Sequence, residues 1–183
     1  MTDLGNDLET SNSDVYPDQI TRNIIESHRK YRSPNTGDLA ELRRLDPLNP
    51  GGGAFWRLVV RHLEPGGQLR FPDSEQRWAL ILRLVGHLLE LHKENARLGF
   101  ALAEAKVSEM RLSRLLRADL DGLDSLLRTV THQLESAYAR VDLGDVASLV
   151  TTAPSGTSIS PAAQRIRRRV ARHYYRAIRT SES

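Results

Sequence analysis

Arginine is the residue type whose spacing suggests a chemistry most clearly, and it is concentrated late in the chain. The 26 basic residues include only three lysines. Within 161–183, helical periodicity places six arginines within one third of the helix circumference, opposite an apolar side: Arg165, Arg168, Arg169, Arg172, Arg176 and Arg179. Like charges at these spacings repel one another, so we expect this stripe to meet phosphates, or else carboxylates of a neighbouring element. Arg167 falls among the apolar positions, where we expect an ion pair inside the protein or at an interface.

Further arginines form three smaller basic spots on earlier predicted helices: Arg43 with Arg44, then Arg111 with Arg114 and Arg117, then Arg128. Each spot alone is typical of an ordinary protein surface. If a helical bundle folded them to one side, they would line a groove for a sugar-phosphate backbone. The planar guanidinium group donates forked hydrogen bonds to phosphate, and each such contact releases counterions, so binding would weaken steeply with salt.

Patterns typical of enzymes are missing from the sequence. The glycines at 51–53 lack the lysine that follows in a phosphate-binding loop, and they indicate a flexible turn. His87 and His92 are five positions apart and so face different sides of a helix, whereas the zinc motif requires four. Asp119, Asp121 and Asp124 are close together, but Asp121 and Asp124 suit the first turn of a helix better than a metal site. The chain has no cysteine. We therefore predict a non-catalytic protein without cofactor or metal.

Charge is distributed unevenly along the chain. Residues 1–18 sum to −5 and residues 161–183 to +6, within a net charge of +3. Clustered basic charge favours a polyanionic partner. The acidic residues 1–16 indicate a disordered leader, and they carry neither the basic start nor the apolar run of a signal peptide. Every long apolar stretch is interrupted by charge, so we expect a cytoplasmic protein that does not enter the membrane.

The apolar periodicity predicts an all-α fold, a helical bundle made of two small helical subdomains. We expect an N-terminal subdomain over 17–105 and a C-terminal bundle over 106–183 that ends in the basic helix. Trp56 and Trp78 lie within apolar patterns and are expected in the core. Residues suited to helix starts mark four boundaries: Asp73, Ser108, Asp121, and Ser160 before Pro161.

Four segments, in order, resemble the CasB-type small subunits of the type I-E CRISPR surveillance complex, Cascade. Together they cover roughly residues 37–150: GDLAELRR at 37–44, AFWRLV at 54–59, LGFALA at 98–103 followed by RLSRLLRAD at 111–119, and LLR at 126–128 with Leu134 and the Val141–Asp142 step. The sequence departs from the family pattern at Leu143, where a tryptophan is common.

The resemblance implies an all-helical protein with no catalytic activity of its own. Members of this family occur as paired copies along the subunits that hold the guide RNA, and they stabilise the R-loop by holding the displaced non-target DNA strand. The implied partners are the backbone and large subunits of Cascade, a second copy of the chain, single-stranded DNA and guide RNA. Because guide pairing supplies the sequence specificity, such a subunit needs only backbone contacts.

This hypothesis names the arginines that we expect to contact nucleic acid: Arg43, Arg44, Arg97, Arg111, Arg114, Arg117, Arg128, Arg165, Arg168, Arg169 and Arg172. Two alternatives stay open. The first is a helical transcription regulator, which would bind DNA sequence-specifically on its own. The second is a protein–protein scaffold whose basic amphipathic helix docks on an acidic partner or an anionic membrane surface.

Overall fold

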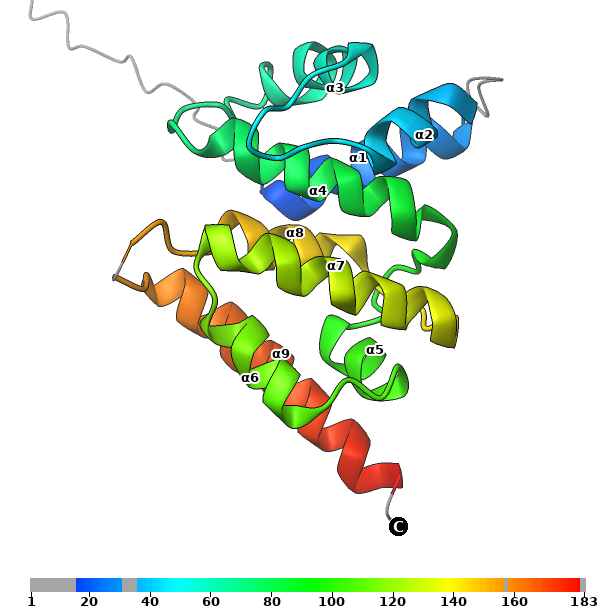
Figure 1. The fold of residues 1–183 in the computed structure, drawn as a ribbon, viewed down its shortest axis with the longest axis vertical. Coiled ribbons are helices and arrows are strands. Elements are labelled where there is room, and N and C mark those ends of the chain that lie inside the picture. The colour runs from blue at the N-terminus through cyan, green and yellow to red at the C-terminus, as the bar shows by residue number, and fades with distance from the viewer. Residues whose placement is uncertain (1–15, 31–35, 157, 182–183) are drawn as a thin grey trace, which may run out of the picture.

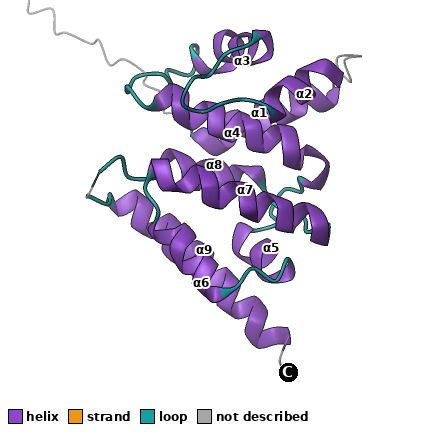
Figure 2. Cartoon of the chain, in the orientation of Figure 1, coloured by secondary structure: helices purple, strands orange, loops and turns teal. Residues whose placement is uncertain are grey.

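The computed structural model describes residues 16–30, 36–156 and 158–181. The expected disordered leader, apart from Tyr16, lies outside the described residues. All regular elements in the described ranges are helices (Figure 2), which confirms the all-α prediction. The α-helices are α1 (Pro17–Lys30), α2 (Thr36–Arg43), α3 (Gly53–Leu58), α4 (Ser74–Leu88), α5 (Leu98–Glu104), α6 (Glu109–Arg117), α7 (Leu120–Ala137), α8 (Leu143–Thr151) and α9 (Pro161–Ser181). A π-helical turn, η1 (Val59–Leu63), follows α3, and a 3₁₀ turn, η2 (Leu89–Leu91), follows α4.

The helices lie in three tiers (Figure 1). The upper tier holds α1 to α4, the middle tier α7 and α8, and the lower tier α5, α6 and α9. One continuous apolar core runs through them, with α2 packed on α4, α1 on α8 and α5 on α9. The expected division into subdomains at residue 105 stays a prediction. Helices from both sides of that point pack on one another: α1 and α4 pack on α8, and α5 packs chiefly on α9.

Helix α4 is the central element because it is covered on several sides. Trp78 and most of the apolar residues of α4 are buried, as predicted. Three polar contacts in the same order along both helices show that α4 and α7 run parallel: Gln76 with Asp121, Arg83 with Asp124, and His87 with Glu135. Trp56 lies outside the core, contrary to the prediction. It is 44% exposed and packs edge-on against the buried Phe55.

The predicted helix starts are mostly found. The Ser108 hydroxyl accepts from the Arg111 N–H at 3.3 Å, and the Ser160 hydroxyl accepts from the Ala163 N–H at 3.1 Å. The prediction for α7 was wrong by two residues, because Asp119 is the cap and accepts from the Gly122 N–H at 2.8 Å. Helix α4 does start after Asp73, but that side chain makes no capping bond.

Helices α5 and α9 approach each other closely at a glycine. A Cβ atom on Gly99 would lie 2.2 Å from the Val170 carbonyl oxygen and 2.8 Å from the Tyr174 nitrogen. Both are backbone atoms that cannot rotate away, so the packing requires a residue without a side chain. The close approach also brings the neighbouring Phe100 ring against the His173 ring.

Candidate nucleic-acid interface

Helices α6 and α9 lie side by side and run antiparallel. Arg167, early in α9, donates from Nη2 to the carbonyl of Ala118, just after α6, at 2.9 Å. Tyr175, late in α9, donates from its hydroxyl to Glu109, the first residue of α6, at 3.2 Å. The two helices are therefore neighbours in the lower tier (Figure 1).

The outward side of α9 is an arginine stripe, defined here as Arg165, Arg168, Arg172 and Arg176, all of which are exposed. Within the part of the chain that the structure describes, none of the four has an ion-pair partner. Helix α9 itself contains no carboxylate between Pro161 and Ser181. Four of the six arginines predicted to share one side of α9 are therefore exposed without a described ion-pair partner, whereas Arg169 pairs with Asp145 at 3.3 Å.

Helix α6 contributes two more outward arginines. Arg114 and Arg117 are exposed, and neither forms an ion pair with a described residue. Since Ala118 contacts the early part of α9, Arg117 lies close to where the arginine stripe begins. Arg111 differs, because it is half-buried and donates from Nη1 to the Gln133 side chain on α7 at 2.9 Å.

A buried carboxylate joins two further predicted residues beside the arginine stripe. Asp145 on α8 is 6% exposed, and its Oδ1 atom lies 3.4 Å from Arg97 Nη1 and 3.3 Å from Arg169 Nη2. Its other oxygen accepts from the Leu98 N–H at 3.2 Å. The two guanidinium groups are thus held close together while remaining partly exposed, so they border the arginine stripe in a fixed position.

The remaining predicted residues lie elsewhere in the fold. Arg43 is the last residue of α2 in the upper tier, and Arg44 follows it. Arg43 donates from Nε to the Gly86 carbonyl of α4 at 2.7 Å. Arg128 lies on the outer side of α7 and pairs with Asp124 at 3.4 Å. The structure therefore brings Arg97 and Arg169 together beside the arginine stripe, whereas Arg43 and Arg44 lie apart from them in the upper tier.

Two other arginines are buried and serve the fold. Arg167 was expected to be ion-paired, but it contacts the Ala118 carbonyl and no described carboxylate, and burial lowers its pKa. Arg83 was not anticipated as a buried residue, but its side chain is 5% exposed and lies between the Leu45 carbonyl and Asp124. Burial, with Arg128 nearby, lowers the pKa of Arg83 to about 10, so the group stays charged at neutral pH.

The two histidines weighed as metal ligands, His87 and His92, contact other parts of the fold instead. His87 lies half-buried with Nδ1 3.2 Å from Glu135, while His92 is buried and its Nδ1 accepts from the Leu143 N–H at 3.2 Å. Among the described residues no cluster of three His, Asp or Glu side chains is arranged to hold a metal ion. No described helix is long and apolar enough to span a bilayer.

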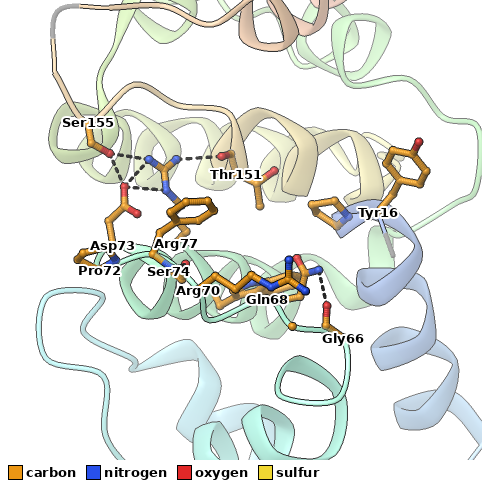
Figure 3. A pocket seen from close by; sticks show the side chains of 14 residues that line it. Tyr16, Gly66, Gln68, Arg70, Pro72, Asp73, Ser74, Arg77, Thr151 and Ser155 are labelled. Carbon is orange, nitrogen blue, oxygen red and sulfur yellow. Dashed lines mark hydrogen bonds and ion pairs between the residues drawn. The ribbon is translucent and has the colours of Figure 1, made fainter. Parts of the chain in front are cut away.

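A hollow of about 800 Å³, not anticipated from the sequence, lies between the starts of α1 and α4 and the end of α8 (Figure 3). One wall is a network in which Arg77 donates to Asp73 at 2.6 Å, to Ser155 at 2.6 Å and to the Val150 carbonyl at 2.8 Å. The hydrogen bond from Arg77 lowers the pKa of Asp73. The charged groups of this wall therefore bind one another and tie α4 to the segment after α8.

The described part of the chain is thus helical, and α9 carries an exposed stripe of arginines. The profile of the family CRISPR-associated protein Cse2 matches residues 38–175, well over half of the chain. The chain therefore belongs to the Cse2 family, the CasB-type small subunits of type I-E Cascade, as its resemblance to that family suggested. No curated protein and no solved structure matches it. Family membership makes it a subunit of a CRISPR Cascade complex, in a family not known for enzymes.

Proposed function

We propose that the face formed by α6 and α9 binds the sugar-phosphate backbone of the displaced non-target strand within Cascade and thereby stabilises the R-loop. The proposal rests on one observation. Arg114, Arg117 and the arginine stripe point outward without an ion-pair partner among the described residues. Unpaired like charges repel, and a phosphate backbone along the face would offset that repulsion with charge-assisted hydrogen bonds.

The subunit acts by binding alone and leaves strand cleavage to other components. A backbone-binding face carries no sequence information, which agrees with a complex whose specificity comes from guide pairing. Its partners in this proposal are the backbone and large subunits of Cascade, a second copy of the chain, single-stranded DNA and guide RNA, in the cytoplasm. Arg43, Arg44, Arg111 and Arg128 stay predicted contacts outside the main face.

The experiment compares Cascade carrying Arg168→Glu with Arg172→Glu against Cascade carrying lysine at both positions. R-loop lifetime on a matched target is measured across a salt series. The double reversal is expected to shorten the lifetime and to reduce the salt slope of binding by about 1.4, since each lost single-strand phosphate contact contributes about 0.7. The lysine variant keeps the charge and most of the binding.

Three outcomes contradict the proposal. An unchanged lifetime and salt slope in the double reversal show that the arginine stripe does not contact the strand. Loss of the subunit from Cascade at low salt, with strand binding intact, shows that α9 docks on an acidic protein surface. Sequence-specific DNA binding by the isolated chain against random competitor supports a transcription regulator.

A further inference from the structure

An exposed aromatic pair lies at the seam between α5 and α9, beside the arginine stripe. The rings of Phe100 and His173 are stacked, with centroids 5.1 Å apart and planes inclined by 17°. Phe100 is 42% exposed although it belongs to a helix with a buried apolar side. The packing of Gly99 against the α9 backbone fixes the pair in place. A large apolar ring is therefore held rigidly at the surface.

Cationic groups surround this pair. Arg97 and Arg169, both held by Asp145, stand on the same seam, and the charges of Arg97, Arg169 and Arg176 all act on His173. A shallow hollow is lined jointly by His173 and five arginines of α9: Arg165, Arg168, Arg169, Arg172 and Arg176. The aromatic pair and the arginine stripe therefore border one continuous surface.

His173 is suited to support a stacked ring. Burial lowers its pKa, as do the neighbouring arginines, and Asp145 acts in the opposite direction. The imidazole is therefore neutral at neutral pH and adds no further positive charge to the seam.

An aromatic ring beside guanidinium groups suits an unpaired base better than a duplex. Phosphate contacts alone do not distinguish single-stranded from double-stranded nucleic acid. An exposed ring, by contrast, can stack only on a base that is not already stacked within a duplex. We infer that Phe100 stacks on an unpaired base of a single strand whose adjacent phosphates lie on Arg97, Arg169 and the arginine stripe. This inference rests on the proposed function and assigns its ligand class as single-stranded nucleic acid.

The test varies two things independently, the side chain at position 100 and the presence of bases in the ligand. The full chain and assembled Cascade are titrated with oligo-dT and with an abasic oligonucleotide of equal length, which carries the same phosphates. Wild type is expected to prefer oligo-dT at least about fivefold, because one stacked base is worth at least ~1 kcal/mol. Phe100→Leu is expected to remove that preference while keeping abasic binding and the salt slope. Phe100→Trp keeps the preference.

A second measurement needs no variant. Wild-type Cascade is irradiated on a target whose displaced strand carries 5-iodouracil, and the crosslinked peptides are sequenced. Crosslinking to the peptide 98–106 is expected. Oligo-rU is titrated in the same way to distinguish guide RNA from the DNA strand as the ligand. The oligonucleotide whose affinity falls in Phe100→Leu corresponds to the strand on which Phe100 stacks.

The outcomes separate this inference from the proposed function. If Phe100→Leu binds both oligonucleotides as wild type does, and peptide 98–106 is not crosslinked, stacking is refuted while backbone binding stands. If Arg168→Glu with Arg172→Glu leaves abasic binding unchanged, backbone binding itself fails. If Phe100→Leu keeps oligonucleotide affinity but dissociates from Cascade, Phe100 is a protein contact and the inference is overturned.

Discussion

Replacing Gly99 with alanine is expected to force α5 away from α9 and to destabilise the chain. The new Cβ atom would lie 2.2 Å from the Val170 oxygen, whereas ordinary contacts begin near 3.4 Å, so the helices must separate by about 1 Å. Overpacking of this kind costs up to ~3 kcal/mol. Alanine regains ~1 kcal/mol through its higher helix propensity. The expected net loss is therefore ~2 kcal/mol.

Thermal unfolding of the full chain measures this effect as a fall in Tm of roughly 4–8 °C for a domain of this size. Gly37→Ala is the matched control, because Gly37 also lies in a helix and a Cβ atom there has no neighbour within 4 Å. That control is expected to raise stability by ~0.4–1 kcal/mol. A Gly99→Ala chain as stable as wild type would refute the close packing of α5 on α9.

Two further predictions concern buried polar groups. Asp124→Asn leaves Arg83 buried without its carboxylate and is expected to lower the free energy of unfolding in urea by about 3 kcal/mol. Arg128→Ala removes the other partner of that carboxylate, which is 63% exposed, and is expected to lower it by less than ~0.5 kcal/mol. Equal costs would show that Arg83 does not depend on the pair. Burial holds the pKa of His92 below 6.5, so its contribution to stability is complete above 6.5 and is lost as pH falls through the lowered pKa. His92→Asn keeps an acceptor for the Leu143 N–H and is expected to flatten that fall, although three other histidines contribute in the same direction. An unflattened profile contradicts the assignment.

Local signals in the sequence predicted the helices well. Ser108 and Ser160 cap α6 and α9 as expected, because a hydroxyl that accepts a backbone N–H acts within one turn and depends on neighbouring residues alone. The start of α7 was misplaced because Asp119 and Asp121 both suit a helix start. The first residue of α7, Leu120, donates its N–H to the Pro154 carbonyl, a contact between distant parts of the chain that local sequence does not reveal.

Contacts between distant residues also explain what was missed in the core and at the interface. Helix α3 is only six residues long and passes directly into η1, so its periodicity was too short to tell which face is buried, and Trp56 emerged on the surface. Periodicity predicted that the arginine stripe shares one side of α9. Periodicity contained no information about which arginines meet a carboxylate, because Asp145 lies on α8 while Arg169 lies on α9 and Arg97 precedes α5.

The absence of carboxylates from α9 also links ionic strength to the free chain in a particular way. Screening by salt relieves the mutual repulsion of the stripe, so added electrolyte should make the unbound subunit more resistant to unfolding. The same ions compete for phosphate and lower the affinity of the subunit for a nucleic-acid strand. Conditions that best preserve the purified subunit are therefore those under which it holds its ligand least tightly.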